Sequence, residues 1–127
     1  VLSISDYVVL SLPLTEETRG LIGERELKLM KPTAFLINVS RGPIVNEEAL
    51  YRALTEKWIA GAGIDVWWHY PTSPDTPSRL KINTLKNVIA TPHKAGWTLE
   101  SRRRTLIFAA ENVSRFILGQ KILNLVG

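Results

Sequence analysis

The stretch AFLINVSRGPIVNEEAL, residues 34 to 50, changes from a strand pattern to a helix pattern within a few residues. It begins with an apolar run of strand length, and Val39 to Gly42 follow as a turn. Asn46 is a good helix N-cap, and the two glutamates after it suit the positive end of a helix dipole. The stretch therefore predicts a strand, a turn and a helix in succession, which is the repeating pattern of an α/β fold.

The same alternation runs along the whole chain. Four short apolar runs predict strands, over Tyr7 to Leu10, Ala34 to Asn38, Ala62 to Val66 and Val88 to Thr91. Continuous apolar runs of this kind suit the strands of a parallel sheet that is buried on both faces. Helices are predicted over Glu24 to Met30, over residues 47 to 58, and from Thr98, as N-cap, to Gly119. The expected fold is therefore α/β, a partial Rossmann-type parallel sheet with flanking helices and a long C-terminal helix.

Composition narrows the classes of function. A chain of 127 residues with 45% hydrophobic residues predicts one compact folded unit. The absence of cysteine excludes disulfides and thiolate chemistry, and two histidines far apart in sequence argue against a metal site. No apolar run has the length of a membrane span and no signal peptide is evident, so we expect a cytoplasmic protein without membrane contact. The net charge of +4 is modest and says little about partners.

In open parallel sheets, ligands bind outside the carboxyl ends of the strands. The segments that follow the four predicted strands are Ser11 to Pro13, Val39 to Gly42, Asp65 to Tyr70 and His93 to Gly96. One edge of the sheet is thus expected to gather an arginine, an aspartate and a histidine from three separate turns.

These turns lie in blocks that resemble the NAD-dependent D-isomer-specific 2-hydroxyacid dehydrogenases, in particular their glyoxylate/hydroxypyruvate reductase and phosphoglycerate dehydrogenase-like members. The blocks are SLPLTEETRGLI (11–22), MKPTAFLINVSRGPIVNEEAL (30–50, with Met30 where the family has leucine), GAGIDVW (61–67) and NVIATPHKAGWT (87–98). By this resemblance, residues 1–127 are the C-terminal part of a dinucleotide-binding domain. The family's glycine-rich loop, G-x-G-x-x-G, does not occur in the sequence, and neither does its substrate domain.

The resemblance implies hydride transfer between a nicotinamide cofactor, NAD with NADP left open, and a small 2-oxo or 2-hydroxy acid. Arg41 would bind the carboxylate and carbonyl of the 2-oxo acid, because a guanidinium offers a fixed fork of donors. His93 would be the general acid and base, since imidazole exchanges protons near neutral pH. Asp65 would contact the nicotinamide carboxamide. The full set of implied cofactor contacts is Ser11, Leu12, Pro13, Thr15, Val39, Ser40, Arg41, Asp65, His93 and Ala95.

One position departs from the family pattern. Five positions after Asp65, where the family has an acidic residue that orients the catalytic histidine, this chain has Tyr70. A tyrosine hydroxyl can accept a hydrogen bond from an imidazole, but it carries no charge at neutral pH and stabilises an imidazolium less than a carboxylate does. The formate dehydrogenase branch uses a neutral glutamine there, so hydride transfer does not require the charge. Asp75 is a second candidate for the carboxylate if its loop folds back.

Two alternatives stay open at this stage. The chain could be a non-catalytic dimerising or regulatory module of the same fold, as in relatives that act as transcriptional co-repressors. Nucleic-acid contact has little support, because Arg102 to Arg104 face several directions of a helix and lack interleaved aromatics.

The second alternative concerns the length of the chain. If residues 1–127 are the whole protein, half of the dinucleotide site is missing, and we expect the chain alone to be inactive as an enzyme. Its exposed sheet edge would then favour pairing with a second copy as a homodimer.

Overall fold

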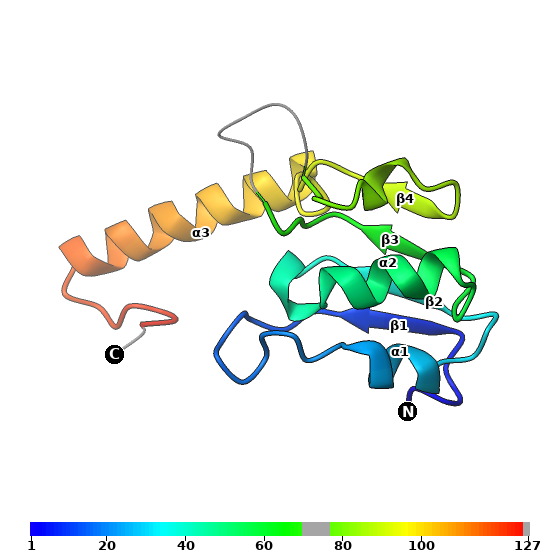
Figure 1. Ribbon diagram of the computed structural model, residues 1–127. Helices are drawn as coiled ribbons and strands as arrows, with labels where there is room; N and C mark the ends of the chain where they lie inside the picture. Colours follow the sequence, from blue (N-terminus) through cyan, green and yellow to red (C-terminus); the bar gives the residue numbers. More distant parts are fainter. Residues whose placement is uncertain (70–76, 126–127) are drawn as a thin grey trace. The chain divides into compact units, whose positions relative to one another are not determined.

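The structure, a computed structural model, describes residues 1–69 and 77–125, and it divides into two compact units, Val1–Lys94 and Ala95–Gly127 (Figure 1). The sequence predicted a single compact unit. In the second unit the long helix α3 (Leu99–Ile117) has no buried residue, whereas the first unit has a buried core of its own. The two units are therefore described separately.

The first unit contains a parallel sheet of four strands in the order β1-β2-β3-β4. The strands are β1 (Tyr7–Leu10), β2 (Phe35–Asn38), β3 (Gly61–Ile64) and β4 (Val88–Ala90). The four predicted strands and their parallel arrangement are confirmed: β1 has the predicted bounds, and the ends of the other three differ from the prediction by at most two residues. Since all four strands run in the same direction, their carboxyl ends meet at one edge of the sheet.

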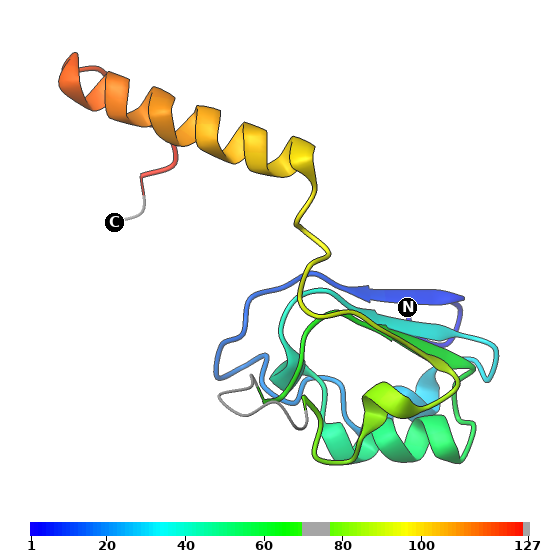
Figure 2. The same cartoon turned by 90° about the horizontal axis from the view of Figure 1, so that it is seen from above.

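Two helices, α1 (Glu24–Leu29) and α2 (Glu47–Thr55), cover the same face of this sheet (Figures 1 and 2). Leu27 and Leu50 from the helices share one buried cluster with Leu36 and Ile64 from the strands. The opposite face of the sheet is exposed, as Tyr7, Val9, Phe35 and Ile89 show. The prediction that the strands are buried on both faces is therefore wrong for the described residues, because both helices between the strands lie on one face.

The helix α2 begins where its capping residue predicts, but it ends earlier than predicted. The Asn46 side chain accepts a hydrogen bond from the Ala49 amide at 2.9 Å, so the predicted N-cap of α2 is confirmed. At its other end α2 stops at Thr55, three residues earlier than predicted, and Lys57 takes a left-handed backbone with φ 60°. Trp58 therefore lies outside the helix, where Lys28 and Arg52 stack against its ring.

Two short 3-10 helices, η1 (Gly42–Ile44) and η2 (Ile82–Thr84), were not predicted. The segment before η2 is fastened to the start of α2. The hydroxyl of buried Ser78 and the amide of Leu80 both donate to the Glu47 carboxylate, at 2.8 and 3.3 Å. These bonds hold the described segment that leads into η2 against α2.

The second unit consists of α3 and the segments that flank it. Thr98 caps the helix by accepting a hydrogen bond from the Ser101 amide at 3.0 Å, and Gly119 follows its end with φ 66°. Both predicted ends of this helix are confirmed. Its apolar residues, which repeat at helical spacing, are exposed within the described chain: Leu99, Leu106, Val113 and Ile117. No helix within residues 1–69 and 77–125 is both long and apolar enough to cross a membrane.

Candidate active site at the carboxyl edge of the sheet

Four residues that directly follow the strands form a row across the carboxyl edge of the sheet. Register places Leu10, Asn38, Ile64 and Ala90 side by side, so the residues after them are Ser11, Val39, Asp65 and Thr91. The ladder extends into this row, because the Asp65 and Thr91 amides each donate to the neighbouring strand at 3.0 Å. Three strand spacings separate the ends of the row, which makes it about 14 Å long.

A buried asparagine shapes the turn that carries Arg41. Asn38 is 1% exposed, and its side-chain oxygen accepts hydrogen bonds from both the amide and the hydroxyl of Ser40, at 3.1 and 2.9 Å. Its side-chain nitrogen donates to the Arg41 carbonyl at 2.9 Å. The Arg41 Nη1 in turn donates to the Ser40 carbonyl at 2.6 Å. The turn is thus fixed from within the sheet, while the Arg41 side chain is exposed.

The next residue, Gly42, lies directly against the backbone of the segment after β3. A Cβ added at Gly42 would come within 2.3 Å of the carbonyl carbon and oxygen of Trp67 and within 2.7 Å of the Trp68 amide nitrogen. The indole of Trp68 also donates to the Val45 carbonyl at 2.7 Å. Glycine is therefore required by the close approach of two chain segments, and this approach joins the Arg41 turn to the Asp65 segment.

We expect Gly42→Ala to destabilise the protein by about 3 kcal/mol, because the atoms that its methyl group meets are backbone atoms that cannot rotate away. Gly63→Ala in β3 is the matched control, since its Cβ would meet only the Ile37 side chain, at 3.8 and 3.9 Å. Urea unfolding of both variants measures the difference. If the two variants had the same urea midpoint, the Arg41 turn and the Trp67 segment would be able to move apart at no cost in the free energy of unfolding.

The third turn, which carries His93, is held by Asp65. This carboxylate is 4% exposed, and its Oδ1 accepts hydrogen bonds from the Thr91 hydroxyl at 2.5 Å and from the Lys94 amide at 2.8 Å. His93 lies between these two donors with φ 55°, in the left-handed region. A non-glycine residue there costs on the order of 1 to 2 kcal/mol, so the surrounding bonds must maintain the conformation.

The segment after β1 attaches to the same edge through η1. Thr15 and Thr18 exchange hydrogen bonds within a tight loop, in which the Thr18 hydroxyl also donates to the Pro13 carbonyl at 2.8 Å. Further along, the Gly20 amide donates to the Pro43 carbonyl at 2.9 Å. The predicted contact residues Ser11, Leu12, Pro13 and Thr15 thus belong to a loop that is fastened beside the Arg41 turn.

Two of the predicted site residues cannot be placed with the others. Ala95 is the first residue of the second unit, which is described by itself. Tyr70, at the position of the family's acidic residue, lies outside the described residues, and so does Asp75. The described part of the site therefore consists of the three turns and the loop after β1. Within the described residues, no group of three or more His, Asp or Glu side chains could hold a metal ion.

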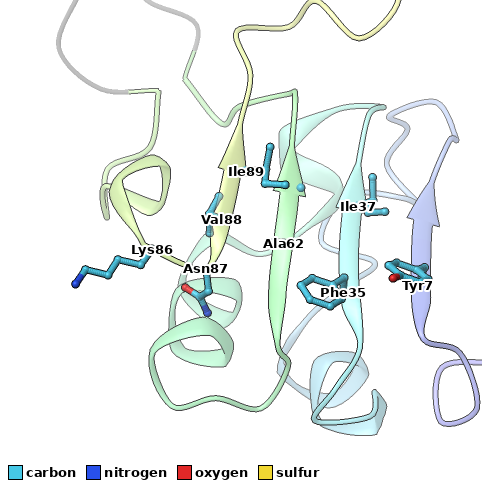
Figure 3. Close-up of a pocket in the computed structure, with 9 residues that line it drawn as sticks. Tyr7, Phe35, Ile37, Ala62, Lys86, Asn87, Val88 and Ile89 are labelled. Atoms are coloured by element: carbon cyan, nitrogen blue, oxygen red, sulfur yellow. The ribbon is translucent and has the colours of Figure 1, made fainter.

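A hollow of about 500 Å³ lies elsewhere, on the bare face of the sheet (Figure 3). Its lining is mostly apolar and includes the stacked rings of Tyr7 and Phe35, whose centroids are 5.9 Å apart, together with Ile37 and Ile89. Asn87 and Val88 place it toward the amino ends of the strands. Because none of the predicted site residues lines this hollow, the row at the carboxyl edge is the better candidate for the site.

Comparison with known proteins identifies the family to which the chain belongs. The family model described as D-isomer specific 2-hydroxyacid dehydrogenase, NAD binding domain, matches residues 1–95. The chain belongs to this family. The resemblance inferred from the four sequence blocks is therefore confirmed, as are the Rossmann-like fold and a nicotinamide dinucleotide as the cofactor of the family.

Similar relatives of the chain include two glyoxylate reductases. Glyoxylate reductases of Korarchaeum cryptofilum and Aeropyrum pernix are 48% and 49% identical to it over 126 and 122 residues, which are 99% and 96% of this chain. Those matches cover only 37% and 35% of the relatives. The chain thus spans about a third of the length of the curated relatives it matches.

Solved structures of 2-hydroxyacid dehydrogenases have the same fold. The NAD-complexed enzyme from Lactobacillus delbrueckii ssp. bulgaricus has a TM-score of 0.86 at 32% identity, and the match covers 99% of this chain and 41% of that one. The enzyme from Xanthobacter autotrophicus Py2, in complex with NADPH and MES, has a TM-score of 0.79 at 38% identity and coverages of 99% and 50%. The two structures differ in cofactor, since one holds NAD and the other NADPH.

Sequence reasoning missed the residues that hold the site together. Asn38 and Gly42 shape the Arg41 turn, while Thr91 and the indole of Trp67 fasten the His93 turn. Asn38 carried a signal, because a polar amide at the end of an apolar strand must find hydrogen-bond partners when it is buried. No sequence signal indicates the role of Gly42, since the close approach of Trp67 depends on the tertiary structure.

Proposed function

We propose that residues 1–127 are the C-terminal part of the cofactor domain of an enzyme that reduces a small 2-oxo acid, such as glyoxylate, with NADH or NADPH. The observation that carries the proposal is the joining of the Arg41, Asp65 and His93 turns at one edge of a parallel sheet. Its substrate class is supported by the similar proteins named glyoxylate reductase. The activity is assigned to the full-length protein that carries this chain.

In this proposal Arg41 and His93 both act on the carbonyl oxygen of one small molecule, and Arg41 also binds its carboxylate. The Arg41 guanidinium binds the carboxylate of the 2-oxo acid and stabilises the negative charge that grows on the carbonyl oxygen. The protonated His93 imidazole donates a proton to that oxygen, which completes the hydroxyl group of the product. The hydride, with its electron pair, would come to the carbonyl carbon from a reduced nicotinamide held at this edge.

The residues at this edge fit the nicotinamide end of the cofactor. Val39 is an apolar side chain that is 42% exposed, and it lies in the row beside the buried carboxylate of Asp65. The main chain of Ser11 to Pro13 continues the row on its other side. The sequence holds no G-x-G-x-x-G loop, so this chain supplies no glycine-rich loop to the pyrophosphate.

NADH binding tests the cofactor part of the proposal. Val39→Asp should raise the Kd for NADH at least about tenfold, because it places a negative charge beside an anionic cofactor and removes apolar contact. Isothermal titration of NADH into the full-length protein measures this Kd. Asp65→Ala would not isolate cofactor contact, because losing this carboxylate would also release the His93 turn.

Leu29→Asp is the matched control for this titration. Leu29 is 53% exposed at the end of α1, where the chain leads toward the amino end of β2. The same change of charge there should leave NADH binding unaltered. If wild type does not bind NADH at millimolar concentration, or if both variants weaken binding equally, the row is not the cofactor site.

A homodimer and a cytoplasmic location remain part of this proposal. Within the described residues one face of the sheet is apolar and exposed, and a second copy is one partner that would cover it where the rest of the cofactor domain does not. The regulatory alternative, which would use the arginines at the start of α3, gains no support. Arg104 pairs with Glu100 at 2.8 Å, and Arg102 stacks on the Trp97 ring. Both contacts lie within the second unit and suit a solvated helix.

A further inference from the structure

Thr91, the first residue after β4, is fastened to the sheet through three of its groups. Its amide donates to the Ile64 carbonyl at 3.0 Å, and its carbonyl accepts a hydrogen bond from the Trp67 indole at 2.9 Å. Its hydroxyl donates to Asp65 Oδ1 at 2.5 Å. The backbone and the side chain of Thr91 are therefore both fixed relative to β3.

The same carboxylate oxygen fastens the other side of His93. The Lys94 amide donates to Asp65 Oδ1 at 2.8 Å, so one atom joins the residues on both sides of the histidine turn. Asp65 is 4% exposed, and hydrogen bonds to a carboxylate that is shielded from water are strong. Between the two fastened positions lie Pro92, whose ring fixes its own φ, and His93 with φ 55°.

We propose that Thr91 is a positioning residue for His93. Its hydroxyl, together with the Asp65 carboxylate, fixes the turn that holds His93 in the left-handed conformation, and it thereby sets the direction of the imidazole. The catalytic consequence rests on the proposed function, in which His93 donates the proton. Asp65 then has a structural role at the site in addition to any contact with the cofactor.

The test removes the hydroxyl and then restores it. In the full-length protein, Thr91→Val should lower kcat for glyoxylate reduction about tenfold while the KM for glyoxylate changes less than threefold, because the substrate is still bound but the proton donor is misplaced. Hydrogen exchange of the peptide that contains the Lys94 amide should become about tenfold faster. Thr91→Ser keeps the hydroxyl and should restore both values to within twofold of wild type.

Thr84→Val is the matched control. The Thr84 hydroxyl donates to the Lys81 carbonyl at 2.9 Å in the exposed turn of η2, so this variant also loses one hydroxyl hydrogen bond. It should leave kcat and the exchange of the Lys94 amide unchanged. The proposal is overturned if Thr91→Val behaves as wild type does, or if Thr91→Ser is as impaired as Thr91→Val.

The exchange measurement separates this proposal from the proposed function. If wild type shows no NADH-dependent reduction of any small 2-oxo acid, the proposed function fails. Faster exchange at Lys94 in Thr91→Val, with rescue in Thr91→Ser, would still establish that Thr91 holds the turn. If wild type is active and exchange does not respond to Thr91→Val, the positioning role fails and the proposed function stands.

Discussion

His93→Asn is expected to lower kcat for the NADH-dependent reduction of glyoxylate about 1,000-fold in the full-length protein that carries this chain. The asparagine amide cannot give up a proton to the carbonyl oxygen as the hydride reaches the carbon. Asparagine is chosen because it tolerates the left-handed region, where residue 93 has φ 55°. The turn should therefore keep its backbone, so that the loss reports on proton transfer. Steady-state rates, followed by the disappearance of NADH, measure it.

The other histidine of the chain provides the control. His69 is exposed, and its amide donates to the Pro77 carbonyl at 3.2 Å in the segment after β3. His69→Asn should leave kcat within about twofold, as surface substitutions usually have small effects. If His93→Asn kept more than a tenth of the wild-type kcat, another group would have to donate the proton.

The main features of the fold could be predicted from local sequence patterns. Each of the four strands is a short apolar run bounded by turn residues, and Asn46 and Thr98 cap the helices as their side chains predict. These features depend on interactions between residues that are close in sequence. Once the strands are taken to be parallel, the order of strands and turns also places Arg41, Asp65 and His93 at the carboxyl edge of the sheet.

Other features of the fold depend on contacts between distant residues, which local patterns do not contain. The runs around Leu36 and Val9 are apolar throughout, yet Leu36 is buried and Val9 is exposed, because α1 and α2 cover only one face. The end of α2 was placed too late because Trp58 fits the helical apolar stripe. In the structure Trp58 packs beside Lys28 and Arg52 after the helix has ended.

In the site, too, some roles could be predicted from the sequence and others depend on contacts between distant residues. Resemblance to a family assigned roles to the side chains that would touch substrate or cofactor, and it assigned none to Asn38 or Thr91. Both of these residues hold a turn through hydrogen bonds. Asn38 bonds to Ser40 and to Arg41, and Thr91 bonds to Asp65. Asp65 itself was predicted only as a cofactor contact, since its bonds to Thr91 and Lys94 join positions 26 and 29 residues away.

Arg41→Lys is expected to lower kcat/KM for glyoxylate about 100-fold. Lysine keeps the positive charge, but it lacks the planar fork of donors that matches a carboxylate. The Arg41 side chain is exposed, and its backbone carbonyl is held by Asn38, so the substitution should leave the turn intact. Arg79→Lys is the control, because Arg79 is an exposed arginine that pairs with Glu48 on the surface, and an exposed pair contributes little.

A second substrate shows whether Arg41 acts through the carboxylate. Glycolaldehyde carries the same aldehyde group as glyoxylate but has a hydroxymethyl group in place of the carboxylate. If the Arg41 fork binds that carboxylate, Arg41→Lys should reduce kcat/KM for glyoxylate at least about tenfold more than for glycolaldehyde, since only one of them loses a bidentate partner. An equal loss for both substrates would place Arg41 at the carbonyl oxygen or the cofactor, and the binding of the carboxylate would have to be assigned to another residue.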